Sequence, residues 1–600
     1  MMATAQFPVY YSIHFADLSG HYLDISVDFT PTQPCHQLSL PAWIPGSYMI
    51  RDFARHLIAI TAVDSQGPLL IQQSDKQNWQ LQCRGLAVTV RYRLYAFDTS
   101  VRAAYLDDEI AVLNPACLCL AVSDLQQQIH HLRVHAPRQQ TANSWRLATA
   151  LTRAADTEFL GFGDYQARDY QQLIDSPLLA GHFSLSQFSV NGVEHYLVLS
   201  GDNLTDQQRI TADVASLCQQ QAAVFDGLPD DLSAYWFLVW VTEQGFGGLE
   251  HQQSTLLLCS RFDLPAPGLA VPDDAYQQFL ALCSHEYFHL WWVTRLKPAC
   301  FSPFQLQQEQ YSKQLWLYEG FTSYYDELAL ARSGLISEAQ YLTLLEKTIS
   351  RVTRNPSEQV QSLAESSFTA WTKFYKQDEN AINAVVSYYA KGALVAFCLD
   401  AALRQQGSNL DKLCRYLYQH YLASGTFDDS IYLALQQLGF ADLARQLQGW
   451  VETTAPLPLA AASEQLGLSL TWRQAQHQDD VCGQAAGEDM AQLGAIVTEQ
   501  AGLLKVKQVL NGSAAHQAGL MAGDQLLALA GFKLSSASLS QLLRRLAIGT
   551  VQPLVIFRKD RLLELKLPVA YGPAHVAMLQ VQQPMLNRPW HSLVSIATLS

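Results

Sequence analysis

Two histidines four residues apart, His285 and His289, interrupt an otherwise apolar stretch that runs from Phe279 to Val293. Apolar residues recur at helical spacing here, and residues four apart share one face of a helix. Burying two imidazoles on such a helix is costly unless a metal or other partners satisfy them. The pattern predicts a helix over residues 277–292 whose imidazoles bind one metal ion, with solvated or internally satisfied histidines as the alternative.

Glu286 lies between the histidines and completes the pattern His-Glu-x-x-His. Its carboxylate is displaced from the ligand face, so it can contact a water on the metal without binding the metal itself. That is the position of a general base. Asp273 and Asp274 are suited to cap the start of the helix, and Pro298 follows its expected end.

A third ligand is expected because catalytic zinc usually has three protein ligands and one open position. Glu319, in the run Trp-Leu-Tyr-Glu-Gly-Phe at residues 316–321, stands at the head of a second helical pattern. A carboxylate favoured by a helix N-terminus is the alternative explanation. We expect one Zn²⁺ per chain, bound by the two histidines and Glu319. Asp326 is a candidate acceptor for a ligand histidine, with Glu327 or a backbone carbonyl as alternatives.

The chain has 600 residues and is too long for one hydrophobic core, so several domains are expected. Hydrophobic residues make up 49% and charged residues 16%, which is typical of folded globular domains. The formal net charge is −15, and no basic stretch could neutralise phosphates. A nucleic-acid partner is therefore not expected.

Neither a secretory signal nor a membrane span is expected. The first twenty residues lack a basic region followed by an apolar one. No apolar run reaches the roughly 18 residues of a transmembrane helix. The eleven cysteines are scattered and odd in number, which favours reduced thiols and a cytoplasmic location.

The hydrophobic patterns divide the chain into regions. Residues 1–180 are β-rich, with alternating apolar and polar residues. Residues 181–455 begin with buried strand patterns and one helix and then become helical. A Pro/Ala-rich segment at 453–463 is a linker candidate. Short strand patterns return at 464–573, and residues 574–600 form a tail with little pattern, for which a docked and a loose arrangement both stay open.

One segment of the β-rich region stands out: residues 41–48, Pro-Ala-Trp-Ile-Pro-Gly-Ser-Tyr, with Arg51 and Arg55 shortly after. Its Pro45-Gly46 pair predicts a sharp turn. The arginines, beside aromatic residues and an aspartate, can form a buried ion-paired corner. We favour a domain-packing element over a direct catalytic role for this segment.

These features together resemble the glycyl aminopeptidase family of gluzincin zinc metallopeptidases. The segment 41–48, the His-Glu-Tyr-Phe-His motif and the run 316–325 carry the resemblance, which covers most of the chain. It implies a multidomain α+β protein: a β-rich N-terminal domain at 1–180, a thermolysin-like, mainly helical catalytic domain at 181–455, and a C-terminal PDZ-like domain at 464–573. It also implies an aminopeptidase that removes N-terminal Gly or Ala from peptides.

The resemblance gives meaning to Gly247-Gly248-Leu249-Glu250-His251, which is similar to the Gly-x-Met-Glu-Asn element of related zinc aminopeptidases. It implies that Glu250 binds the free α-ammonium of the substrate. The glycines would let the backbone lie along the substrate as an edge strand. Leu249 replaces the usual Met and His251 the usual Asn, which leaves the neighbouring substrate contacts open.

A second motif, Tyr-Ala-Lys-Gly from Tyr389 to Gly392, is similar to a helix start in related aminopeptidases. There the tyrosine hydroxyl donates a hydrogen bond to the oxyanion. The resemblance implies this role for Tyr389 in preference to the adjacent Tyr388. Two core tyrosines without a catalytic role are the alternative.

The C-terminal region resembles a PDZ domain in the segments 493–496 and 512–524. Leu493-Gly494-Ala495-Ile496 is a candidate carboxylate-binding loop, although it lacks the usual second glycine. The resemblance implies a peptide C-terminus as a possible partner. A purely packing role stays open.

Two other functions stay open. One is a zinc metalloendopeptidase to which the PDZ-like domain delivers proteins. The other is a non-catalytic scaffold that keeps a structural zinc. The intact Glu286 argues against the scaffold, because a structural metal needs no general base.

Overall fold

The computed structural model describes residues 8–138, 144–484, 488–500, 502–585 and 588–593. The chain forms two compact units. The first is made of Met1–Gln310, Tyr421–Gly425 and Leu593–Ser600, and the second of Tyr311–His420 and Thr426–Ser592. The candidate histidines and Glu250 belong to the first unit, whereas Glu319, Tyr389 and the C-terminal domain belong to the second. Each unit is described by itself.

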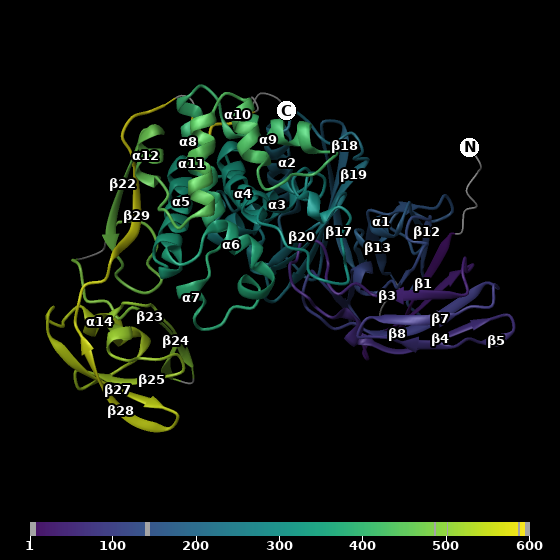
Figure 1. Cartoon of the computed structure of the whole chain (residues 1–600), viewed down its shortest axis with the longest axis horizontal. Coiled ribbons are helices and arrows are strands. Elements are labelled where there is room, and N and C mark those ends of the chain that lie inside the picture. The colour runs from purple at the N-terminus through teal and green to yellow at the C-terminus, as the bar shows by residue number, and fades with distance from the viewer. Residues whose placement is uncertain (1–7, 139–143, 485–487, 501, 586–587, 594–600) are drawn as a thin grey trace. The chain divides into compact units, whose positions relative to one another are not determined.

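Three sheets build the N-terminal region of the first unit (Figure 1). The eight strands of the largest are, in sheet order, β14 (Thr152–Arg153), β15 (Gly163–Ala167), β12 (His130–Val134), β1 (Val9–Asp17), β2 (Tyr22–Phe29), β8 (Val88–Tyr95), β4 (Leu57–Asp64) and β5 (Gly67–Pro68). One four-stranded sheet has the order β13 (Arg146–Thr149), β16 (Leu178–Gly181), β10 (Ile110–Leu113), β9 (Ala104–Leu106). The other has the order β11 (Ala121–Val122), β3 (Cys35–Ser39), β7 (Asn78–Gln82), β6 (Ile71–Gln73). The predicted β-rich domain is confirmed.

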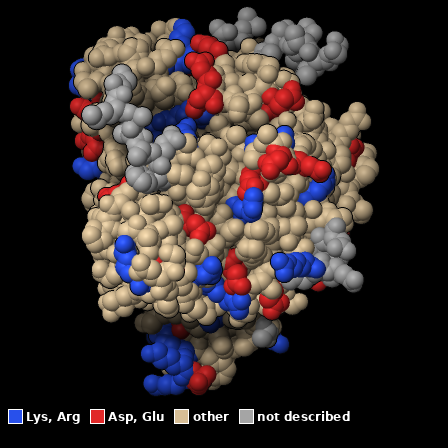
Figure 2. Space-filling view, turned by 90° about the vertical axis from the view of Figure 1, so that its right-hand side faces the viewer, with Lys and Arg blue, Asp and Glu red and all other residues tan. Residues whose placement is uncertain are grey.

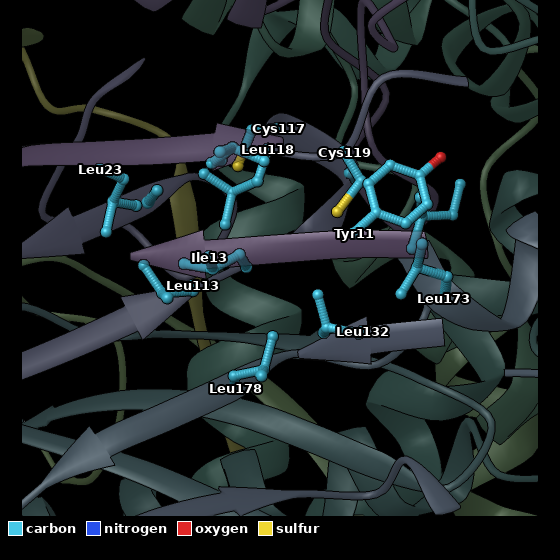
Figure 3. Packing of buried hydrophobic residues seen from close by; sticks show 14 of the residues in the cluster. Tyr11, Ile13, Leu23, Leu113, Cys117, Leu118, Cys119, Leu132, Leu173 and Leu178 are labelled. Carbon is cyan, nitrogen blue, oxygen red and sulfur yellow. The ribbon is translucent and has the colours of Figure 1, made fainter. Parts of the chain in front are cut away.

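The core of this region follows the period-2 pattern of the sequence. On β2 every second residue is buried, including Leu23 and Val27. Figure 3 shows Ile13, Leu23 and Leu132, from different strands, in one buried cluster. Burial of alternating positions fixes the register of each strand, since a one-residue slip would turn the apolar side chains to the outside.

A five-stranded sheet follows, and it carries the candidate substrate strand at its edge. Its order is β17 (Phe183–Val190), β18 (Val193–Ser200), β19 (Ala234–Thr242), β21 (Ser254–Ser260), β20 (Gly247–Glu250). The helices α2 (Gln207–Val224) and α3 (Asp274–Phe288) pack against each other. β19 is buried along nearly its whole length, as expected for a parallel strand in the middle of a sheet.

Helices dominate the first part of the second unit, as the sequence predicts. They are α4 (Phe321–Arg332), α5 (Glu338–Thr353), α6 (Leu363–Phe368), α7 (Ala381–Ala384), α8 (Ala390–Gln405), α9 (Leu410–Tyr421), α10 (Ser430–Gln437), α11 (Ala441–Glu452) and α12 (Leu459–Gln465). α8 is buried on almost every side and packs against α4, α5, α11 and α12 (Figure 1). A helix that is apolar all round belongs in the centre of such a bundle.

The C-terminal domain is a small β domain with its own core. Its sheet has the order β23 (Ala495–Gln500), β24 (Leu503–Val509), β25 (Gln525–Leu529), β27 (Val551–Arg558), β28 (Arg561–Pro568), with β26 (Phe532–Lys533) paired to β25. Two short helices accompany it, α13 (Ala514–Gln517) and α14 (Ser536–Leu543).

In this region one sequence prediction needs correction, and one open alternative is decided for the described residues. Half of the predicted linker is helix α12, which packs on α8. The predicted tail begins with a docked strand, β29 (Ala574–Val581), which pairs with β22 (Leu468–Gln474). The N–H groups of Ala577 and Leu579 also donate hydrogen bonds to the side chains of Ser350 and Glu346 on α5. Because β22 and β29 are far apart in sequence, local sequence patterns do not predict their pairing. Residues 586–587 and 594–600 of the tail lie outside the described residues.

Charged side chains of both signs are interspersed on the face shown in Figure 2, with wide uncharged areas between them. Among the helices of the described residues, none combines the length and apolarity needed to cross a membrane.

Candidate metal centre and substrate site

Helix α3 presents the two histidines as predicted. Asp273 caps its first turn by accepting a hydrogen bond from the Tyr276 N–H at 2.9 Å. The helix ends at Phe288, and His289 follows as its C-cap. The imidazole centroids of His285 and His289 are 4.8 Å apart. Both rings therefore lie on the same face of the last helical turn, close enough to share one cation.

The hydrogen bond of His289 fixes which of its nitrogens can bind a metal. Nδ1 lies 3.0 Å from the carbonyl oxygen of Trp292, so Nδ1 carries the proton and donates it. Nε2 then keeps its lone pair, as a metal ligand requires. Val293, the next residue, has a φ of 79°, which is rare for a β-branched residue. The group that accepts the hydrogen bond of His289 is therefore a backbone carbonyl, which was one of the alternatives to Asp326.

Three candidate residues of the first unit form one cluster. Glu250, Glu286 and His289 each offer a ligand atom, and these atoms all lie within 4.8 Å of one another. All three residues are buried. Two carboxylates held this close in a buried site repel each other and attract positive charge. The cluster therefore fits a metal cation on its histidine side and an ammonium group beside Glu250.

The glycines of the edge strand lie against this cluster. A Cβ atom on Gly248 would collide with Oε1 of Glu286, so only glycine lets β20 pass this close to the candidate base. A Cβ on Gly247 would be 3.4 Å from the Arg102 guanidinium, which donates a hydrogen bond to the Gly248 carbonyl at 3.2 Å. Arg102 thus fixes the strand from the N-terminal domain, and sequence reasoning missed it.

His251, which stands where related enzymes have Asn, fixes the other end of β20. It is 2% exposed, and its Nδ1 is 3.1 Å from Oδ1 of Asp175. The second oxygen of Asp175 accepts a hydrogen bond from the Gln252 N–H at 3.0 Å. The departure from the family pattern therefore has a local structural role.

In the second unit, Glu319 lies on a π-helical turn (Trp316–Gly320) and is 2% exposed. A Cβ on the next residue, Gly320, would be 2.5 Å from Cα of Gly392. A Cβ on Gly392 would be 2.7 Å from the Trp316 carbonyl oxygen. The glycines of the two sequence motifs thus touch each other, which holds the turn that carries Glu319 against the start of α8.

Tyr389 stands at the N-cap of α8 and is partly accessible, whereas Tyr388 is fully buried. The hydroxyls of Tyr389 and Tyr375 are 3.2 Å apart. Removal from water raises the pKa of Tyr389 well above its usual value, and the negative charge of Glu319 adds to this. The phenol therefore stays protonated and able to donate. Lys391 of the same motif pairs with Glu358 at 2.8 Å.

A cavity of about 520 Å³ lies in the second unit, beside the C-terminal sheet. The predicted loop Leu493–Ile496 lines it, together with strand β23 and helix α14. One side chain covers the edge of β23: the Gln478 amide donates to the Val497 carbonyl at 3.0 Å and accepts from the Val497 N–H at 2.9 Å. Gln478 makes the two bonds that an added peptide strand would make there.

Family models match two parts of the chain. The model of the peptidase M61 N-terminal domain matches residues 10–182, and the model of the M61 glycyl aminopeptidase matches residues 278–395. The second match contains His285, Glu286, His289, Glu319 and Tyr389. The chain matches no curated protein.

Solved structures extend this result. The aminopeptidase N family protein from Idiomarina loihiensis is similar, with 39% sequence identity, a TM-score of 0.93, and coverage of 96% of this chain and 98% of that one. The M1 zinc metallopeptidase from Deinococcus radiodurans is more distant, with 12% identity and a TM-score of 0.47, covering 75% of this chain and 95% of that one. The chain belongs to the M61 glycyl aminopeptidase family and is a zinc metallopeptidase.

Proposed function

We propose that the protein is an aminopeptidase that hydrolyses the first peptide bond of substrates with N-terminal Gly or Ala. The observation that carries this proposal is the buried cluster of Glu250, Glu286 and His289. It combines a metal ligand, a base and a carboxylate for a substrate amine. The preference for N-terminal Gly or Ala is inferred from the match to the glycyl aminopeptidase family.

We propose that His285, His289 and Glu319 bind one zinc ion per chain. Two imidazoles and one carboxylate are a typical donor set for catalytic zinc. The His289 tautomer supports this assignment, as does the burial of Glu319. When bound, zinc lowers the pKa of a coordinated water and polarises the scissile carbonyl.

Glu286 accepts a proton from the attacking water and then delivers it to the leaving amine. The Gly248 backbone packs against its carboxylate and restricts its orientation. Tyr389 donates its hydroxyl proton in a hydrogen bond to the oxyanion. Its raised pKa keeps this donor intact at neutral and mildly alkaline pH.

Glu250 pairs with the substrate α-ammonium, and the edge strand Gly247–Glu250 lies along the substrate backbone. Because a buried carboxylate and an ammonium attract strongly, only a chain that ends one residue before the scissile bond satisfies both Glu250 and the metal. This pairing distinguishes an aminopeptidase from an endopeptidase.

The test is a panel of aminoacyl p-nitroanilides, with and without a chelator, on wild type and Glu250→Ala. We expect chelator-sensitive hydrolysis of glycyl and alanyl substrates, which Glu250→Ala reduces far more than any cleavage of N-acetylated peptides. Equal loss on both substrate types would contradict the role of Glu250. Efficient cleavage of N-blocked peptides would favour the endopeptidase, and bound zinc without hydrolysis would favour the scaffold.

For the C-terminal domain we propose a PDZ-like fold whose cavity binds a peptide C-terminus. The cavity between β23 and α14, with the loop Leu493–Ile496 at its wall, supports this proposal. Binding along β23 requires Gln478 to leave Val497. Immobilised heptapeptides with free C-termini, compared with their C-terminal amides, test it: selective retention of the free acids is expected, and equal retention of both would contradict it.

A further inference from the structure

The turn at Pro45-Gly46 reaches the candidate substrate site. Gly46 has a φ of 85°, in the left-handed region. A Cβ on Gly46 would lie 2.5 Å from Oε2 and 2.6 Å from Oε1 of Glu250. The bare main chain of the N-terminal domain is thus in direct contact with both oxygens of the carboxylate.

The turn itself is held firmly. The Ser47 N–H donates to the Ile44 carbonyl at 3.1 Å and closes the turn. Ser47 is fully buried, and its hydroxyl accepts a hydrogen bond from the Arg51 guanidinium at 2.8 Å. Gly46 is therefore placed at the tip of a turn that one backbone and one side-chain hydrogen bond stabilise.

The flanks of the turn are anchored to the segment that follows helix α3. Trp43 donates its indole N–H to the carbonyls of Gln305 and Gln308, at 3.1 and 2.9 Å. Tyr48 stacks on Phe301, with ring centroids 5.8 Å apart. These contacts on both sides of Gly46 prevent the turn from retreating when Glu250 moves.

We propose that Gly46 is a positioning residue for Glu250, and that the N-terminal domain is thereby part of the substrate-ammonium site. This inference rests on the proposed amine-binding role of Glu250. The turn limits the positions that the Glu250 carboxylate can adopt and holds its oxygens toward the substrate. Because both oxygens touch Gly46, a rotation of the carboxylate does not relieve a clash there, and a side chain at position 46 must displace it.

The experiment compares Gly46→Ala with Gly85→Ala in the full-length, zinc-loaded enzyme. Gly85 also has a left-handed φ, 80°, but no atom lies within 4 Å of a Cβ built there. Both variants place an alanine at a left-handed φ, so the backbone strain of such a replacement is common to both. We expect Gly46→Ala to raise KM for glycyl p-nitroanilide by about tenfold or more, as lost ammonium binding predicts, and Gly85→Ala to leave it unchanged.

A rescue separates positioning from general damage. Glu250→Asp withdraws the carboxylate by one methylene and lowers activity by itself. In combination with Gly46→Ala it should remove the clash, so the double variant should be at least about fivefold more active than the product of the two single effects. Strict additivity would overturn the inference.

The outcomes also distinguish this inference from the proposed function. If Glu250→Ala leaves glycyl p-nitroanilide hydrolysis unchanged, the amine-binding role of Glu250 fails. If Glu250→Ala is damaging but Gly46→Ala behaves like Gly85→Ala, only the role of Gly46 fails. Should Gly46→Ala not fold, Ser47→Ala loosens the same turn without altering Gly46. A rise in KM at unchanged kcat is then expected, and an unchanged KM would overturn the inference.

Discussion

The candidate active site of the first unit and the cavity beside the C-terminal sheet differ in what contacts their key groups: main chain in the first, a side chain in the second. Around Glu250 and Glu286 the main chain presses directly on the carboxylates, through Gly46 and Gly248. Beside the cavity, the side chain of Gln478 forms hydrogen bonds with both backbone groups of Val497 on strand β23.

The difference has a physical consequence. A main-chain contact moves only if a whole turn or strand moves, so the carboxylates in the first region are pre-organised. A glutamine amide leaves its partner by rotating about side-chain bonds, which costs little beyond two hydrogen bonds of about 1 kcal/mol each. The first region is suited to chemistry that needs fixed groups, and the second to a ligand that enters and leaves.

Removing the base should have the largest effect on the pre-organised side. Glu286→Gln keeps the shape of the side chain but cannot accept the water proton, so kcat should fall by about 10³-fold. Zinc content, measured by elemental analysis, should stay at the wild-type level because Glu286 is not a proposed ligand. Turnover near the wild-type rate would refute the assignment of Glu286.

The oxyanion donor comes next. Tyr389→Phe should lower kcat by about 10²-fold, because the hydroxyl that stabilises the oxyanion is lost. Tyr388→Phe is the matched control, since this neighbouring ring is fully buried. Kinetics on alanyl p-nitroanilide would check both, and an equal loss from the two variants would indicate a packing effect.

Gln478→Ala tests the other side of the comparison. The Val497 amide should exchange its hydrogen about fivefold faster, since it loses an acceptor worth about 1 kcal/mol. Peptides with free C-termini should bind more tightly. Gln517→Ala is the control, because this glutamine lines the same cavity but donates to the Gly512 carbonyl. Faster hydrogen exchange at Val497 without tighter peptide binding would contradict the prediction that Gln478 competes with a peptide.

The smallest expected effect concerns the support behind helix α3. His195 accepts a hydrogen bond from the Tyr287 hydroxyl, and burial lowers its pKa to about 4. The unfolded chain binds this proton near pH 6.5, so the folded state loses stability as the pH falls from about 6.5 toward 4. Between pH 7 and pH 5 the free energy of unfolding should fall by about 2 kcal/mol less in His195→Gln than in the wild type. Thermal unfolding at both pH values would check this, and an unchanged difference would contradict it.

Local patterns predicted much of this structure. The His-Glu-x-x-His spacing, the cap at Asp273 and the apolar period identified helix α3, because helical neighbours are only four residues apart. The alternating strands of the N-terminal domain were predicted for the same reason. The tail strand β29 was not, since its partner β22 is remote in sequence.

The sequence by itself determined the helix of the two candidate metal ligands. It also pointed to Glu286 as the proposed general base and, through family motifs, to the residues proposed to bind the substrate. The sequence favoured a packing element for the segment around Gly46, and only the tertiary structure showed that its turn also lies against the carboxylate of Glu250. The same holds for the contact between Gly320 and Gly392, which brings the turn carrying Glu319 to Tyr389. The physical reason is that a glycine needed for close approach has no local signature: its requirement comes from a partner that only folding brings against it.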